Sequence, residues 1–242
     1  MSHPTSVAPP GRRCFGLVRR KRVWALTWRG WLLLLLAVLG GAFVFLHTVH
    51  PFLAIHAPLD TPVLVLEGWV PEYAATGYVV RCRSDTTIYT VGGPTLQDRH
   101  SLDVSDTHAS VARGRLLKAG VPAGRVQMVP CWDVQRDRTY SSALALRDWC
   151  RTNHVELRAV NVATLGAHAR RSRLLFQKAF GPEVKVGIIS LPKDDYDASR
   201  WWQYSEGFKE VLSEGAAYLF VRFLFSPETI PHARAQPAES LK

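Results

Sequence analysis

The sequence has few cysteines and none of the short motifs that mark common enzyme classes. Only 4 of its 242 residues are cysteine and no two are spaced as C-x-x-C, which excludes a zinc site built on paired cysteines. The chain also lacks a P-loop, G-x-G-x-x-G, G-x-S-x-G and H-E-x-x-H. Standard nucleotide-binding, serine-esterase and zinc-protease functions therefore lose their main support. We expect Cys82, Cys131 and Cys150 to be single buried thiols, with one disulfide, such as Cys131 to Cys150, as the alternative.

Acidic residues are absent from the first 30 residues, which hold seven basic ones. Because the formal net charge of the chain is +10, subtracting these seven leaves +3 for residues 31–242. Nucleic-acid binding needs a basic stripe on a folded surface, and here the basic charge is mainly in a tail. We therefore expect no nucleic-acid partner.

A long apolar run follows the basic tail. Residues 31–46 read WLLLLLAVLGGAFVFL, and the uncharged stretch extends over residues 30–59. Since a bilayer core needs about 20 helical residues, we predict a transmembrane helix over residues 28–49 that contacts the lipid bilayer. A cleaved signal peptide is the alternative, with a weak cleavage site at residues 40–42. The basic tail predicts a single pass through the plasma (inner) membrane, with a cytoplasmic N-terminus and an exterior or periplasmic C-terminal domain.

Strand-like and helical patterns alternate after residue 62. Apolar, strand-like runs occupy 63–66, 87–91, 126–129, 157–163 and 184–190, and helical patterns occupy 72–82, 107–119, 140–153, the end of 164–180, and about 205–225. This alternation predicts an α/β domain with a Rossmann-like, open, mainly parallel five-stranded sheet and helices on both faces. The expected plan is a basic cytoplasmic tail over 1–27, a transmembrane helix over 28–49, a linker over 50–61, the α/β domain over 62–226 and a disordered tail over 227–242.

Polar and glycine residues follow the ends of the expected strands, where open parallel sheets bind ligands. Those that we take as candidates are Glu67, Gly68, Gly92, Gly93, Arg138, Thr139, Thr164, Gly166, His168 and Arg171. The glycines would let a ligand approach the backbone. Glu67 could act as a general base or bind a hydroxyl group, or it could pair with an arginine. Thr139 is also expected to cap the helix that follows it.

Helix geometry separates the basic residues that follow the fourth strand. At about 100° per residue, His168 lies on the buried side and Arg171 at its border, whereas Arg170 and Arg173 point toward solvent. We interpret His168 as an acid/base group or hydrogen-bond donor and Arg171 as an anion clamp. A structural, hydrogen-bonded histidine is the alternative for His168.

The order and spacing of these motifs resemble the envelope-associated domain-of-unknown-function family that includes ElyC, SanA and YdcF. The segments that carry the resemblance are Leu66 to Gly68, Val91 to Gly93, Gly120 to Pro122, Arg138-Thr139, and His168 with Arg171. The sequence departs from the family pattern at Glu67-Gly68-Trp69, which replaces a glycine cluster, so it resembles a divergent branch. The resemblance implies a Rossmann-like fold, often membrane-anchored, and a role in cell-envelope or peptidoglycan-precursor metabolism. Some relatives are thought to bind S-adenosylmethionine.

These features lead to one main hypothesis and two alternatives. The main hypothesis is a membrane-anchored, envelope-facing domain that binds an anionic or sugar-phosphate ligand, small or lipid-linked, as a hydrolase or transferase. Its expected catalytic residues are Glu67, His168 and Arg171, without a metal; the sequence identifies no cofactor. The first alternative is a non-catalytic scaffold that contacts an envelope-synthesis protein through residues 201–204 and the closing helix. The second is an S-adenosylmethionine-binding domain.

Overall fold

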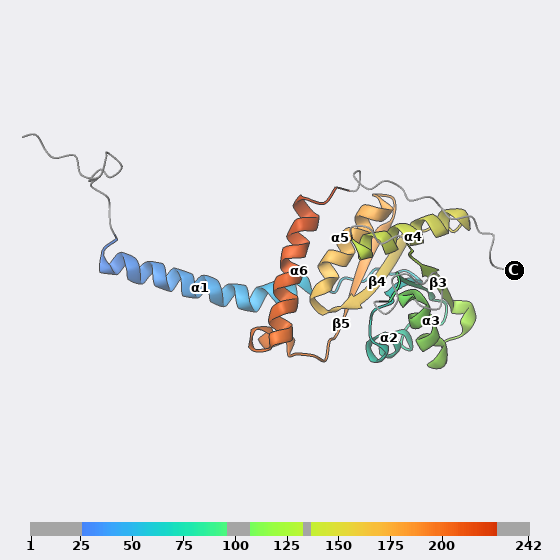
Figure 1. The fold of residues 1–242 in the computed structure, drawn as a ribbon, viewed down its shortest axis with the longest axis horizontal. Helices are drawn as coiled ribbons and strands as arrows, with labels where there is room; N and C mark the ends of the chain where they lie inside the picture. The colour runs from blue at the N-terminus through green and yellow to red at the C-terminus, as the bar shows by residue number, and fades with distance from the viewer. Residues whose placement is uncertain (1–25, 96–106, 133–136, 227–242) are drawn as a thin grey trace, which may run out of the picture. The chain divides into compact units, whose positions relative to one another are not determined.

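The computed structural model describes residues 26–95, 107–132 and 137–226 (Figure 1). The chain forms two compact units, residues 1–43 and residues 44–242. The long helix α1 (Trp28–Leu53) begins in the first unit and ends in the second. Of the two expected tails, residues 1–25 and 227–242 lie outside the described residues.

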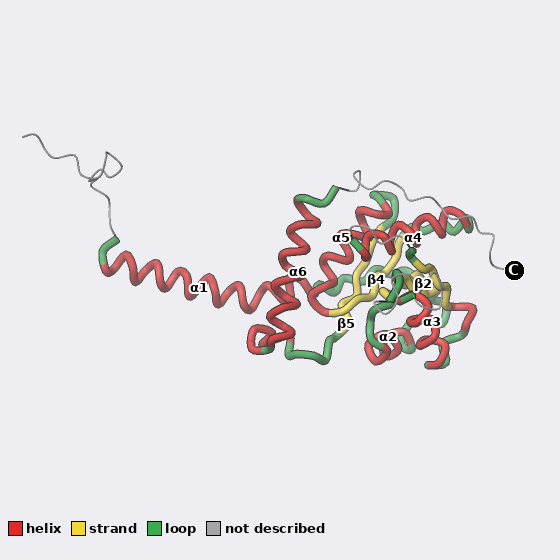
Figure 2. The backbone as a smooth tube through the Cα atoms, in the orientation of Figure 1, coloured by secondary structure: helices red, strands yellow, loops and turns green. Residues whose placement is uncertain are grey.

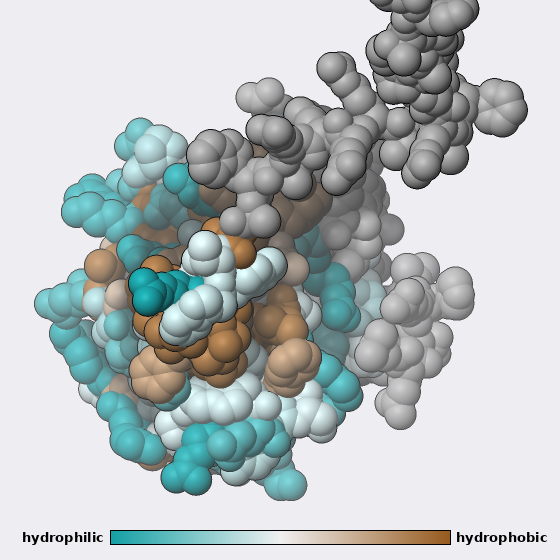
Figure 3. Space-filling view, turned by 90° about the vertical axis from the view of Figure 1, so that its left-hand side faces the viewer, coloured by the Kyte–Doolittle hydropathy of each residue, from teal (hydrophilic) through white to brown (hydrophobic). Residues whose placement is uncertain are grey.

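Helix α1 is long and apolar enough to cross a membrane. It has 26 residues, its mean hydropathy reaches 2.4, and the side chains of that stretch are not buried within the protein. Figure 3, which looks along α1 from its N-terminal end, shows apolar side chains in brown. A helix with apolar side chains on every side is typical of a membrane span.

The end of α1 differs from the expected linker over residues 50–61. The helix continues through Pro51 to Leu53, although proline inside a helix removes one hydrogen bond. Leu53 is buried against Ala167, Trp201 and Val211, and this contact outweighs the cost of the proline. The last turns of α1 therefore belong to the globular unit.

The sheet has five parallel strands in the order β3-β2-β1-β4-β5, which confirms the expected fold class (Figure 2). The strands are β1 (Val63–Glu67), β2 (Thr87–Gly92), β3 (Val126–Pro130), β4 (Ala159–Leu165) and β5 (Lys185–Leu191). The strand order reverses between β1 and β4, where open α/β sheets usually form their ligand crevice.

Helices cover both faces of the sheet. They are α2 (Glu72–Val79), α3 (His108–Lys118), α4 (Arg138–Thr152), α5 (Ala169–Phe180) and α6 (Ser205–Phe223), with short 3-10 helices η2 (Ala123–Arg125), η3 (Gly166–His168) and η4 (Ala198–Gln203). Successive strand residues point to opposite faces, so Val65 packs with α4 and α5 whereas Leu64 and Leu66 pack with α2 and α3. The apolar runs of the strands thus supply two cores.

Helix α4 begins earlier than expected, and Asp137 caps it in place of Thr139. The Asp137 carboxylate accepts a hydrogen bond from the Tyr140 amide at 3.0 Å, and its backbone is extended, as at most N-caps. The prediction that Thr139 is the cap is therefore wrong. Thr139 is buried in the first turn of α4, and its hydroxyl group lies near His168.

The aromatic cluster over residues 201–204 is mainly structural. Trp201 is only 1% exposed, and its indole nitrogen donates a hydrogen bond to the Leu46 carbonyl group at 2.8 Å. The Trp202 ring packs against His47. The cluster thus holds the end of α1 on the globular unit, which removes the main residue on which the scaffold alternative depended. Cys150 is a buried single thiol, as expected, whereas Cys82 is only partly buried.

Gly68 is required where the loop after β1 passes the start of α3. A Cβ atom at this position would lie 2.3 Å from the His108 carbonyl oxygen, and backbone atoms there cannot move independently. We expect Gly68→Ala to lower the free energy of unfolding by about 1–3 kcal/mol. Thermal unfolding of the full chain in detergent measures this effect. Gly124→Ala is the control, since a Cβ atom there would meet no atom within 4 Å; equal melting temperatures for the two variants would contradict the prediction.

Candidate functional site

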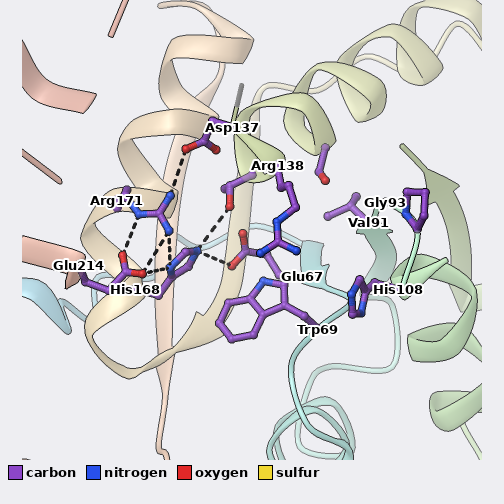
Figure 4. Close-up of a pocket in the computed structure, with 14 residues that line it drawn as sticks. Glu67, Trp69, Val91, Gly93, His108, Asp137, Arg138, His168, Arg171 and Glu214 are labelled. Carbon is purple, nitrogen blue, oxygen red and sulfur yellow. Dashed lines mark hydrogen bonds and ion pairs between the residues drawn. The ribbon is translucent and has the colours of Figure 1, made fainter. Parts of the chain in front are cut away.

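A cavity of about 450 Å³ lies beyond the carboxyl ends of β1 and β2, beside the point where the strand order reverses (Figure 4). It is open to solvent and has the size of a small-molecule site. The lining residues are Glu67, Trp69, Val91, Gly92, Gly93, Pro94, His108, Asp137, Arg138, Thr139, Ser142, His168, Arg171 and Glu214.

His168 lies between two carboxylates in this cavity. Its Nδ1 atom is 3.0 Å from Glu214 Oε1, and its Nε2 atom is 3.7 Å from Glu67 Oε2. The Thr139 hydroxyl group lies 3.4 Å from Nε2, and the Trp69 ring packs edge-on against the imidazole. Arg171 Nη2 also lies 2.9 Å from Nδ1, so Arg171 and Glu214 together fix the orientation of the ring and Nε2 points toward Glu67 and Thr139.

The chain positions His168 through a turn at Gly166. Gly166 has φ +43, in the left-handed region that favours glycine, and it starts η3 directly after β4. This turn brings His168 over the edge of the sheet, toward Glu67 at the end of β1. Strands β1 and β4 are neighbours, so the expected approach of Glu67 and His168 is observed.

Glu67 is only 3% exposed and is held by a single hydroxyl group. Ser172 Oγ lies 3.2 Å and 3.1 Å from the two carboxylate oxygens, on the buried side of α5 where the helix angle placed it. No arginine forms an ion pair with Glu67 within the described parts of the chain. Glu67 therefore remains available to accept a proton or a hydroxyl hydrogen from a ligand.

Arg171 lines the cavity, but its charge is already balanced. Its Nε and Nη2 atoms donate to the two oxygens of Glu214 at 2.7 Å and 3.2 Å, and Nη1 donates to Asp137 Oδ2 at 3.1 Å. Burial opposes the charged form, but these carboxylates outweigh it and raise the pKa of Arg171. The expected role as an anion clamp does not fit this geometry. Arg171 instead positions Glu214 and Asp137.

Glu214 is the functional residue that the sequence pattern did not reveal. It comes from α6, more than forty residues after His168, and no motif marks it. Burial opposes its ionisation, but hydrogen bonds from His168 and Arg171 lower its pKa to about 2. The available signal was the spacing of Glu210 and Glu214, which lie four residues apart and beside the buried Val211.

The other expected ligand-binding residues divide into two groups. Gly92, Gly93, Arg138 and Thr139 line the cavity. Gly68, Thr164 and Gly166 do not line it: Gly68 packs against α3, Thr164 is fully buried, and Gly166 borders a second cavity of about 250 Å³.

Arg170 and Arg173 are half-buried, whereas helix angle placed them in solvent. Arg170 donates to the Phe52 carbonyl group and stacks on the Phe52 ring, and Arg173 donates to the Val186 carbonyl group at 3.0 Å. The position of a residue around the helix axis could not predict these contacts, because the end of α1 and the start of β5, which lie alongside α5, are distant in the sequence. Both arginines are therefore absent from the cavity lining.

His108 joins the site from α3, with its side chain on the opposite side of the cavity from Glu214 (Figure 4). Burial is the main cause of its lowered pKa, and the charges of Arg138 and Arg115 add to it. No group of three or more histidine, cysteine, aspartate or glutamate residues could hold a metal ion in the parts of the chain that the structure describes.

Comparisons with protein-family models, with curated proteins and with solved structures gave no match. The chemical interpretation of the site therefore depends on its own geometry.

The pKa of Glu214 predicts how stability varies with pH. Since it lies below the value of 4.5 for a free glutamate, ionised Glu214 stabilises the fold above about pH 5, and this contribution is lost as the pH falls toward about 2. We expect Glu214→Gln to remove on the order of 3 kcal/mol at neutral pH and to flatten this dependence. Denaturant unfolding at several pH values measures the free energy of unfolding as a function of pH.

Glu206→Gln is the control, since Glu206 is exposed on the same helix, and it should leave this pH dependence unchanged. Identical pH dependence for the two variants would refute the stabilising role of ionised Glu214.

Proposed function

We propose that this protein is a membrane-anchored hydrolase or transferase whose domain faces the cell envelope and binds an anionic, sugar-phosphate-type ligand in the His168 cavity. One observation carries this proposal: His168 is held between Glu214 and Glu67 at an open cavity that Arg138 and His108 also line.

The two carboxylates give His168 the environment of an acid/base catalyst. Glu214 orients the ring, and Nε2 faces the cavity. In the proposed reaction, the acceptor water or hydroxyl oxygen forms a bond to the transferred group as Glu67 takes its proton. The bond to the leaving oxygen breaks, and His168 donates a proton to that oxygen. The positions of Glu67 and His168, 3.7 Å apart, allow both to reach one reacting centre.

The membrane and envelope assignments have separate support. Helix α1 has the length and hydropathy of a membrane span, and the acid-free basic tail before it favours a cytoplasmic N-terminus. The resemblance to the ElyC, SanA and YdcF family adds an expected role in peptidoglycan-precursor metabolism. An envelope-synthesis protein as an additional partner remains part of the proposal, with the exposed apolar side chains of α6 as the available surface.

Replacing His168 tests the catalytic role. We expect His168→Asn to reduce turnover of sugar-phosphate substrates by about 100-fold or more, because general acid–base catalysis contributes about 10²–10⁴-fold. Release of the sugar or of phosphate from a panel of such substrates, with detergent-solubilised full-length protein, measures this loss.

His56→Asn is the matched control for that experiment, because His56 is exposed and far from the cavity lining. It should retain full activity. Full activity of a correctly folded His168→Asn variant would show that His168 has no catalytic role.

Membrane topology can be tested with epitope tags at the two ends of the chain. In intact cells whose outer layers have been made permeable, the C-terminal tag should be accessible to an added protease and the N-terminal tag protected, because basic flanks remain in the cytoplasm. Lysing the cells should expose both tags. Protection of the C-terminal tag would reverse the proposed orientation.

A further inference from the structure

The cavity lining has two electrostatically different parts. In the first part, Glu67, Glu214, His168 and Arg171 form the network described above, and Arg171 also neutralises Asp137. The second part is Arg138 from α4 and His108 from α3, which line the same cavity, and in Figure 4 the Arg138 guanidinium lies between Glu67 and His108. Neither side chain has an ion-pair or hydrogen-bond partner in the described ranges of the chain. Arg138 is the cationic group of the two, because burial and the nearby arginines lower the pKa of His108 and favour its neutral form, which can still donate a hydrogen bond.

A buried hydroxyl group belongs to this second part of the lining. Ser142 is only 6% exposed and lines the cavity one turn after Arg138 on α4, yet its side chain has no hydrogen-bond partner among the residues that the structure describes. A hydroxyl group in the lining of an open cavity can both donate a hydrogen bond to a ligand and accept one from it. Arg138 and Ser142 are four residues apart on the 15-residue α4, so their side chains lie on the same face of the helix.

We infer that Arg138, His108 and Ser142 form a phosphate subsite at the α4 end of the cavity. This inference rests on the proposed function and extends it, since it assigns the anion to residues other than Arg171. A planar guanidinium group binds phosphate oxygens in a bidentate manner, and a hydroxyl group and an imidazole add donors from other directions. A tetrahedral anion with several acceptor oxygens suits this set of donors.

The subsite also sets the orientation of the ligand. With the phosphate group between α3 and α4, the rest of the ligand extends along Trp69, whose side chain is 39% exposed, toward Glu67 and His168. Glu67 can then accept a hydrogen from a ligand hydroxyl group. A cavity of about 450 Å³ holds a single sugar phosphate, whereas a lipid chain would extend out through its open side.

Calorimetric titration of the full-length protein in detergent tests the subsite. The probes are inorganic phosphate, glucose 1-phosphate and glucose. We expect Arg138→Gln to weaken the binding of both phosphate probes by about 10-fold to 100-fold, since hydrogen bonds to charged groups contribute about 1.5–3 kcal/mol. Ser142→Ala should weaken it by about 3-fold to 10-fold. Glucose should bind much more weakly than glucose 1-phosphate.

Arg151→Gln is the matched control, because Arg151 is an exposed arginine in the last turn of the same helix. It should bind phosphate like the wild type. Equal phosphate affinity of the Arg138→Gln variant and the wild type would overturn the subsite, with Arg138 then only a solvated surface residue. Absence of wild-type binding to both phosphate probes up to about 10 mM would overturn it as well.

Two further measurements separate this inference from the proposed function and identify the ligand source. The first is the phosphate affinity of the His168→Asn variant, which should equal that of the wild type because His168 is not part of the subsite. If this variant also retained full activity, the catalytic role of His168 would be refuted and the phosphate subsite would be unaffected. Dodecyl phosphate in the same detergent serves as a lipid-linked probe. Stronger binding of this probe would assign the subsite to a lipid-linked phosphate, and stronger binding of glucose 1-phosphate would assign it to a free one; either result supports the subsite.

Discussion

The partly buried ion pair between Glu214 and Arg171 is the interaction on which the rest of the site depends. A buried carboxylate is stable only when other groups satisfy it, and here Arg171 and His168 both contact Glu214. The same arginine binds Asp137, which caps α4. One guanidinium group therefore links α5, α6 and the start of α4, and it fixes the ring of His168 in the cavity. The catalytic role that we propose for His168 thus depends on contacts that also hold the helices together.

The fold supplies the frame in which this cluster forms. Parallel strands place all their carboxyl ends at one edge of the sheet, and the reversal of strand order between β1 and β4 opens a crevice there. Glu67 and His168 come from those two strands, whereas Arg138 and His108 come from helices that start on the β2 and β3 side. The acidic and basic parts of the cavity lining therefore follow from the topology. An anionic ligand that also carries a hydroxyl group matches this division.

Several parts of the site were predictable because they follow directly from local pattern. Apolar runs with polar ends located Glu67 and His168, and helix angle placed Ser172 on the buried side of α5. Other parts depended on contacts between distant segments. Arg171 was expected to bind an anion, but Glu214 from α6 occupies it. Thr139 was expected to cap α4, but the preceding aspartate does so because its carboxylate reaches the Tyr140 amide. The local sequence pattern does not determine which carboxylate pairs with Arg171 or which of two adjacent residues caps α4.

The sequence by itself determined the apolar helix, the alternation of strands and helices, and the edge of the sheet at which polar residues gather, because these follow from hydrophobic periodicity. Only the tertiary structure decided which charges pair. It brought Glu214 to His168, packed Trp201 against Leu53 at the end of α1, and left Arg138 and His108 in the lining of the cavity. Pairing energies depend on distance and burial, and both are set by the packing of segments that lie far apart in the chain.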